Sequence, residues 1–128
     1  MARKRMARIL VLDDDPSLRT AVRRILERDG HTVLERSKSI GALEFWRVHG
    51  ADLVITDIYM PDRDGIELLL EFRGEAPGLP FIVMSGGGAA GDLGPLKDAM
   101  LLGAVHTLAK PFSRDELLAA VSHALRPN

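Results

Sequence analysis

The sequence predicts an α/β protein in which helices cover both faces of a mostly parallel sheet. Three observations lead to this prediction. Short apolar segments alternate with segments of helical period, turn residues separate the two kinds of segment, and no internal repeat or low-complexity stretch interrupts the alternation. Five strand–helix units in succession favour a three-layer sandwich with right-handed crossovers. The 128 residues are enough for one domain with a sizeable core.

The predicted strands are short apolar runs bounded by polar turn residues, a pattern typical of strands that are buried on both faces. The clearest run is 53–56, because Asp57 follows it and opens a turn that contains Pro61 and Gly65. We expect strands at residues 8–12, 32–35, 53–56, 81–84 and 107–109.

The first predicted helix has the best-defined ends. Apolar residues recur within it at i, i+3, i+4, i+7 and i+8, which gives it one apolar face. Asp15 suits the N-cap, Pro16 the first helical position and Gly30 the end. We expect helices at residues 16–29, 40–49, 66–73, 95–102 and 114–125.

The last two predicted helices differ in how clearly they begin. Ser113 and Glu116 predict a capping box at the start of the helix at 114–125. The helix at 95–102 follows five glycines in the segment 86–94, and Pro95 is the best signal for its first residue.

Composition and charge argue against several classes of protein. The chain is 46% hydrophobic and 27% charged with a net charge of −1, so neither nucleic acid nor an anionic membrane is an expected partner. No apolar stretch reaches the roughly 18 residues that a membrane span needs. The chain has no cysteine, which excludes disulfides and thiol chemistry and suits a cytoplasmic location.

The basic residues 1–7 are expected to form a disordered tail before a domain at 8–126. The alternative is an arm that binds nucleic acid. No apolar segment of the roughly 7–15 residues found in signal peptides follows these basic residues.

Acidic residues end two of the predicted strands. Asp13 and Asp14 follow the first strand, and Asp57 follows the third. Ligands of parallel sheets bind beyond the carboxyl ends of the strands, so these three side chains converge if the two strands are neighbours. Carboxylates about 5 Å apart repel by roughly 3 kcal/mol, and oxygen ligands without His or Cys suit Mg²⁺. The alternative is that residues 13–15 form only a solvated helix cap.

Two further strand ends carry candidate functional residues. Lys110 follows the fifth strand, where its ammonium can reach the acidic residues or a bound phosphoryl oxygen. The peptide bond between Lys110 and Pro111 is a candidate for the cis form. Ser85 ends the fourth strand before Gly86, and its hydroxyl and the following N–H groups can bind an anion. Taken alone, Lys110 is better explained as an ordinary surface residue, and the stretch from Ser85 to Gly88 as a flexible turn.

Taken in order, these motifs resemble the receiver domain of two-component response regulators. The acidic pair after the first strand resembles the family's acidic strand end, and residues 57–65 resemble its phospho-acceptor turn. Ser85 stands at the position of the family's hydroxyl residue, and Lys110-Pro111-Phe112 matches its Lys-Pro-Phe signature. The resemblance covers residues 8–125, and all four motifs fall on the expected strand ends.

The resemblance implies a flavodoxin-like, doubly wound sheet of strand order 2-1-3-4-5 with five helices. It implies that Asp57 accepts a phosphoryl group from a histidine kinase or a histidine phosphotransfer protein. Asp14 and Asp57, with the backbone carbonyl of Tyr59, would bind Mg²⁺, and Asp13 would act largely through bound water. Lys110 and Ser85 would contact the phosphoryl group.

The chain departs from the family pattern at two places. Thr107 stands three residues before the lysine, where the family carries its switch aromatic, and His106 is expected to point to the other side of the strand. The glycine-rich segment 86–94 is longer and looser than the family norm. Both departures concern how a signal leaves the site, and the sequence does not say how it is transmitted.

The leading hypothesis is therefore a stand-alone, phospho-accepting signalling domain rather than an enzyme that acts on other substrates. It would switch contacts with a downstream protein as a monomer or weak dimer. A Mg²⁺-dependent phosphatase is the alternative, but it needs an acid at position 59, where the chain has Tyr59. A flavin- or nucleotide-binding carrier is a third hypothesis, although the acidic residues would repel its phosphate. The sequence names neither the kinase nor the process controlled.

Overall fold

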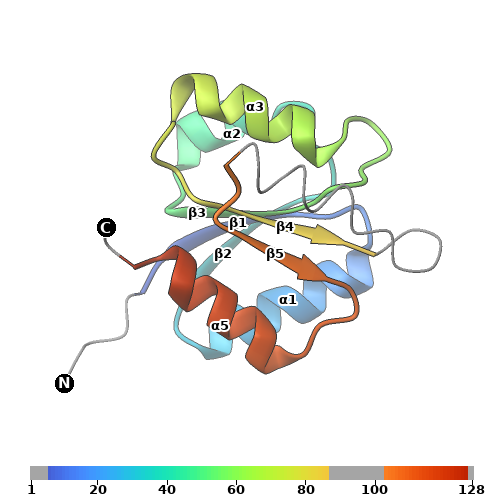
Figure 1. The fold of residues 1–128 in the computed structure, drawn as a ribbon, viewed down its shortest axis with the longest axis vertical. Helices are drawn as coiled ribbons and strands as arrows, with labels where there is room; N and C mark the ends of the chain where they lie inside the picture. Colours follow the sequence, from blue (N-terminus) through green and yellow to red (C-terminus); the bar gives the residue numbers. More distant parts are fainter. Residues whose placement is uncertain (1–5, 87–102, 127–128) are drawn as a thin grey trace.

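The computed structural model describes residues 6–86 and 103–126. They form one five-stranded parallel sheet of order β2-β1-β3-β4-β5, with helices on both faces (Figure 1). This arrangement confirms the predicted flavodoxin-like fold and strand order. The strands are β1 (Arg8–Leu12), β2 (Thr32–Arg36), β3 (Leu53–Asp57), β4 (Phe81–Ser85) and β5 (His106–Ala109).

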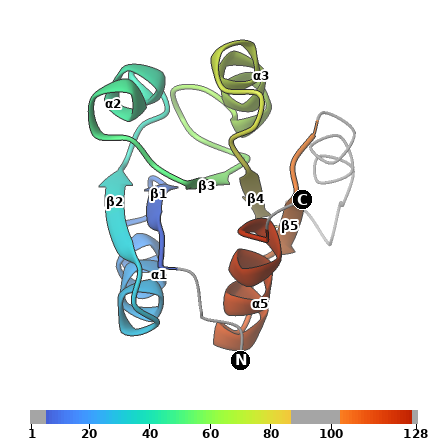
Figure 2. The ribbon, with the colours of Figure 1, turned by 90° about the vertical axis from the view of Figure 1, so that its left-hand side faces the viewer.

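Four helices occur within the described residues, and they flank the sheet in pairs. Helices α1 and α5 lie on one face, and α2 and α3 lie on the other, as Figure 2 shows. The predicted helix at 95–102 and most of the glycine-rich segment fall outside the described residues. The helices are α1 (Pro16–Arg28), α2 (Ala42–His49), α3 (Gly65–Glu75) and α5 (Arg114–Ala124).

Alternation along the strands divides the core into two layers. Ile9 and Val11 of β1 face the layer that contains α1 and α5, whereas Leu10 and Leu12 face the layer that contains α2 and α3. All four side chains are fully buried. A strand buried on both faces needs no polar alternation, which explains why the apolar runs of the sequence are continuous.

The predicted helix caps are present. The Asp15 side chain accepts hydrogen bonds from the backbone N–H groups of Ser17 and Leu18 at the start of α1. Ser113 and Glu116 form the capping box of α5 in both directions. Such caps satisfy N–H groups that have no partner inside the helix, and each contributes about 1 kcal/mol.

Several elements begin or end one residue away from the predicted limits. Strand β2 continues to Arg36, while β3 and β4 include Asp57 and Ser85. The ladder explains the last two extensions, because Asp57 pairs with Met84 and Ser85 pairs with Ala109. Asp57 and Ser85 thus belong to the ladder, whereas Asp13 and Lys110 come directly after the last residues of β1 and β5.

Ala7, which the sequence assigned to the tail, is buried. Its backbone N–H donates a hydrogen bond to Nδ1 of His31, and its carbonyl accepts one from the N–H of Thr32. The packed part of the chain therefore includes this residue. Among the described helices, none has the length and apolar character needed to cross a bilayer.

Candidate functional site

The acidic residues meet at the carboxyl end of the sheet because β1 and β3 are neighbours. Leu12 pairs with Thr56, so that Asp13 and Asp57 each stand one residue further along adjacent strands. Oxygen atoms of Asp13, Asp14 and Asp57 all lie within 4.8 Å of one another. Asp13 and Asp57 are buried, and Asp14 is exposed. The predicted convergence of the three carboxylates is therefore present in the structure.

Lys110 joins this group from the end of β5. Its Nζ atom lies 2.7 Å from Oδ2 of Asp57 and 3.1 Å from Oδ2 of Asp13. The backbone N–H of Lys110 donates to the carbonyl of Ser85, which ties the end of β5 to the end of β4. The peptide bond between Lys110 and Pro111 is cis, as the sequence suggested.

Asp13 and Asp57 are held in the same way. In each residue Oδ2 accepts from Lys110, while Oδ1 accepts from the backbone N–H two residues further along. These N–H groups belong to Asp15, at 2.9 Å, and to Tyr59, at 3.0 Å. A carboxylate that bonds the backbone two residues ahead closes a local turn. Both side chains are thus fixed before any ligand arrives.

Burial and charge act against each other in this cluster. Burial raises the pKa of the Asp13 carboxyl, and the hydrogen bond from Asp15 and the charge of Lys110 offset this only in part. Burial also lowers the pKa of the Lys110 ammonium, but its interactions with Asp57 and Asp13 outweigh that effect, so the pKa of Lys110 is raised. The lysine therefore stays charged, as expected for a cation beside two carboxylates.

Ser85 and Thr107 lie on the two strands beside the cluster. Ser85 is fully buried and stands one residue beyond Met84, the ladder partner of Asp57. Thr107 pairs with Val83 and is half-buried. The His106 ring contacts the ring of His123 on α5, at 5.6 Å between centroids, which confirms that His106 points to the opposite side of β5.

A contact between loops, which the sequence did not reveal, supports the turn at residues 57–65. The fully buried hydroxyl of Ser39 donates to the carbonyl of Arg63, at 2.8 Å, and lies 3.3 Å from Oδ1 of Asp62. The N–H of Ile40 donates to Oδ2 of Asp62, at 2.8 Å. Burial by itself would raise the pKa of the Asp62 carboxyl. The hydrogen bonds from Ile40 and Ser39 outweigh this effect, so the pKa of Asp62 is lowered. This clamp fixes the turn after β3 to the loop after β2.

Gly65 is a further residue whose role the sequence did not reveal. A Cβ atom at this position would lie 2.8 Å from the carbonyl oxygen of Asp57 and 2.9 Å from Cα of Ile58. The N–H of Gly65 donates to the carbonyl of Ile58 at 2.7 Å. The start of α3 therefore packs directly against the backbone that carries Asp57, and only a residue without Cβ fits there.

Comparison with known proteins agrees with this geometry. The family model of the response regulator receiver domain matches residues 9–122. The chain belongs to this family. The receiver domain thus accounts for almost all of the described structure, and the resemblance noted from the motifs is confirmed.

Relatives of known sequence give the same result. The DNA-binding transcriptional regulator NtrC of Azospirillum brasilense is 39% identical over 123 residues, which cover 95% of this chain and 25% of that protein. The transcriptional regulatory protein KdpE of Mycobacterium tuberculosis is 37% identical over 96% of this chain and 53% of its own length. The chain therefore spans about a quarter to a half of these relatives.

Solved structures resemble the whole receiver fold. A response regulator receiver domain protein from Clostridium thermocellum superposes with a TM-score of 0.85 and 34% identity, covering 94% of both chains. The chemotaxis response regulator CheY4 of Vibrio cholerae superposes with a TM-score of 0.83 and 25% identity, covering 94% of this chain and 100% of that one.

The acidic cluster fits the Mg²⁺ that receiver domains generally bind at this place. Its three carboxylates face one lysine, which leaves negative charge uncompensated. The donors are all oxygen atoms, and among the described residues no histidine joins them. Hard cations such as Mg²⁺ prefer such donors.

Proposed function

We propose that this receiver domain accepts a phosphoryl group on Asp57 from a phosphohistidine of a histidine kinase or a histidine phosphotransfer protein. The observation that carries the proposal is the position of the Asp57 carboxylate. It ends a central strand, lies next to Asp13 and Asp14, and has its Oδ2 atom 2.7 Å from the Lys110 ammonium. A carboxylate so placed is a fixed nucleophile with a cation beside it.

The transfer step balances with the residues present. A carboxylate oxygen of Asp57 forms a bond to phosphorus as the bond between phosphorus and the histidine nitrogen breaks, and the imidazole leaves with the electron pair. Lys110 is placed to offset the charge of the phosphoryl oxygens. Mg²⁺ held by Asp13, Asp14, Asp57 and the Tyr59 carbonyl would, when bound, further neutralise that charge.

We infer that phosphorylation then changes the contacts of the domain with a downstream protein. A new phosphoryl group near Lys110 and Ser85 adds charge and acceptor oxygens at the ends of β4 and β5. Because Thr107 replaces an aromatic residue on β5, the signal leaves through another movement of these strand ends. The reaction is confined to the domain itself, since position 59 holds a tyrosine rather than the acid that a phosphatase would need.

The assignment of Asp57 is tested by intact-protein mass after incubation with acetyl phosphate and Mg²⁺. We expect the parent chain to gain one phosphoryl group and Asp57→Asn to gain none. Asp115→Asn is the matched control, because the Asp115 side chain is 93% exposed and lies on α5. Chelation of Mg²⁺ should abolish the gain in the parent. A mass gain that persists in Asp57→Asn would contradict the assignment.

A further inference from the structure

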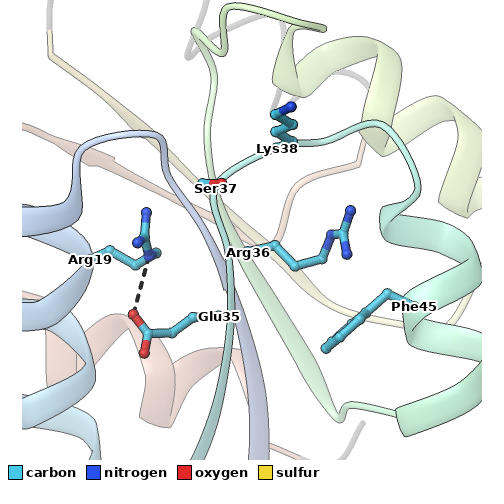
Figure 3. Close-up of a pocket in the computed structure, with 6 residues that line it drawn as sticks. All are labelled: Arg19, Glu35, Arg36, Ser37, Lys38 and Phe45. Atoms are coloured by element: carbon cyan, nitrogen blue, oxygen red, sulfur yellow. Dashed lines mark hydrogen bonds and ion pairs between the residues drawn. The ribbon is translucent and has the colours of Figure 1, made fainter.

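A polar cavity lies outside the acidic cluster, around the carboxyl end of the edge strand β2. Its volume is about 370 Å³, and its lining consists of Arg19, Glu35, Arg36, Ser37, Lys38 and Phe45. Figure 3 shows Arg19 of α1 on one side of β2, and Arg36 and Phe45 on the other, with Ser37 between them. A cavity at the low end of the size range of ligand pockets suits a small molecule.

The charge of this cavity is opposite to that of the whole chain. Three cationic side chains and one carboxylate line it, for a net charge of +2, whereas the chain carries −1. The carboxylate of Glu35 is already compensated, because it accepts from Nε of Arg19 at 3.2 Å and from Nη1 of Arg23 at 3.0 Å. Glu35 therefore does little to repel an incoming anion.

Two of the cations have no acidic partner. Within the described residues, neither Arg36 nor Lys38 forms an ion pair. The only hydrogen bond found there for the Arg36 guanidinium runs from Nη2 to the carbonyl of Ile40, and its buried Nε atom has no acceptor. Buried donors without an acceptor are rare in folded proteins, because they cost free energy.

The Arg36 guanidinium is nevertheless held in place. It lies over the ring of Phe45, 5.2 Å from the centroid, in a cation–π contact. A planar guanidinium fixed in this way can present a pair of N–H donors to two oxygen atoms of one ligand. Lys38 is exposed and adds an ammonium, and Ser37 adds a hydroxyl.

We propose that this cavity, defined by Arg19, Arg36, Ser37 and Lys38, binds a small phosphate dianion, either free phosphate or the phosphate group of a small metabolite. The charge decides between anions, because a phosphate monoester carries close to two negative charges at neutral pH and matches two uncompensated cations. A single carboxylate would leave one of the two cations unpaired.

The site contacts the backbone of Asp13. Arg19 Nη1 donates to the Asp13 carbonyl at 2.7 Å, and the Arg36 carbonyl accepts from the Asp13 N–H at 3.2 Å. A ligand that draws on these arginines therefore perturbs a residue of the acidic cluster, and the Asp13 amide reports its binding. By linkage, any effect on the cluster is matched by an equal effect of the cluster on ligand affinity.

The test is an NMR titration of the ¹⁵N-labelled full chain carrying Asp57→Asn, with Mg²⁺ removed and ionic strength held constant. One arm uses inorganic phosphate and the other uses glucose 6-phosphate, with glucose as the uncharged control. We expect saturable shifts of the amides of residues 36–39 and of Asp13 with at least one of the two phosphate ligands. The ligand that binds with the higher affinity identifies the source of the phosphate. Glucose should cause no such shifts.

Three variants decide whether the cavity is responsible. Arg36→Gln and Lys38→Gln should each weaken binding about tenfold or more. Arg24→Gln, which removes the same charge from an exposed position of α1, should change it less than about twofold. Lys38→Gln keeps the test decisive if Arg36→Gln does not fold. Binding that is unchanged in Lys38→Gln, or the lack of saturation at residues 36–39 in both phosphate arms, overturns the proposal. Neither phosphodonor nor Mg²⁺ is present, so this result is independent of phosphoryl transfer to Asp57.

Discussion

The Nζ atom of Lys110 lies 2.7 Å from Oδ2 of Asp57, although the two residues are 53 positions apart in the sequence. The same ammonium also reaches Asp13, at 3.1 Å. One cation thus holds together two buried carboxylates that would otherwise repel each other at the ends of β1 and β3. Removing the Lys110 ammonium should therefore change both the stability of the domain and the reactivity of the Asp57 carboxylate.

We predict that Lys110→Met lowers the free energy of unfolding by about 1–3 kcal/mol in the absence of Mg²⁺, because two buried carboxylates lose their shared partner. Urea denaturation measures this loss. Adding Mg²⁺ should stabilise the variant more than the parent, since the ion meets less competition for the carboxylates. Lys38→Met removes the same charge from an exposed site and should have little effect. Equal stability of Lys110→Met and the parent would show that the ammonium is not needed to hold the acids.

The second prediction concerns Gly65. Gly65→Ala should destabilise the domain by about 1–3 kcal/mol, because the new Cβ atom must move the Asp57 carbonyl or the Ile58 backbone. Phosphorylation should also slow, since the displaced backbone carries Asp57, the proposed acceptor. Thermal unfolding and the rate of mass gain with acetyl phosphate measure the two effects.

Gly74→Ala provides the matched control for Gly65→Ala. Both glycines lie in α3, but nothing lies within 4 Å of a Cβ atom placed on Gly74. Alanine at that exposed helical position should stabilise the domain by about 0.5–1 kcal/mol. If both substitutions shift stability in the same direction, the close approach of Gly65 to Asp57 is not the cause.

The third prediction is a dependence of stability on pH that arises at His106. Burial lowers the pKa of His106 below 6.5, and the neighbouring His123 lowers it further. The unfolded chain therefore binds a proton at this residue before the folded chain does, and stability falls as the pH drops through 6.5 towards the folded pKa. Above that range the folded and unfolded states are both neutral at this position, and the effect vanishes.

His106→Gln should therefore lose less stability than the parent between about pH 7.5 and pH 5, as measured by urea denaturation at each pH. His123→Gln removes one cause of the shift, so it should raise the pKa of His106, as followed by NMR of the imidazole. A stability difference between the parent and His106→Gln that stays constant over this range would sink the prediction.

The sequence predicted the acidic cluster because its signals are local. An apolar run followed by an acid marks a strand end, and parallel strands bring their ends to one edge of the sheet. This reasoning is enough to bring together Asp13, Asp14 and Asp57, provided that β1 and β3 are neighbours in the sheet, as they are. The caps of α1 and α5 were equally local, since a cap is fixed by residues within one turn.

Features that depend on how loops meet were not predictable in this way. Ser39 and Asp62 are 23 positions apart, and neither has a sequence pattern that distinguishes it from an ordinary turn residue. Gly65 looked like a turn glycine, whereas its role is to let α3 approach the Asp57 backbone. The cavity beside β2 likewise joins residues of α1 and α2 that share no pattern. The burial of Ala7 was missed for the same reason, because its hydrogen-bond partner His31 is 24 positions away in the sequence.

The last prediction is a long-lived phosphoprotein. Hydrolysis needs a water molecule in line with the bond between Asp57 and phosphorus. Tyr59 stands two residues after Asp57, its N–H donates to Oδ1 of Asp57, and the residue is 50% exposed. That side chain is therefore available to cover the approach of water. Gly87, two residues after Ser85, lies outside the described residues, and as a glycine it has no side chain to orient water.

Substitutions at these two positions should shorten the lifetime of the phosphorylated protein. We expect Tyr59→Asn to shorten it by up to about tenfold, which corresponds to about 1.4 kcal/mol, and Gly87→Glu to shorten it further in combination. Tyr59→Phe keeps the bulk and should decay at the rate of the parent. Decay is followed by intact mass after removal of acetyl phosphate. If the parent decays as fast as the double variant, then neither the ring of Tyr59 nor a polar side chain at position 87 affects the attacking water. Positions 59 and 87 would in that case not control hydrolysis.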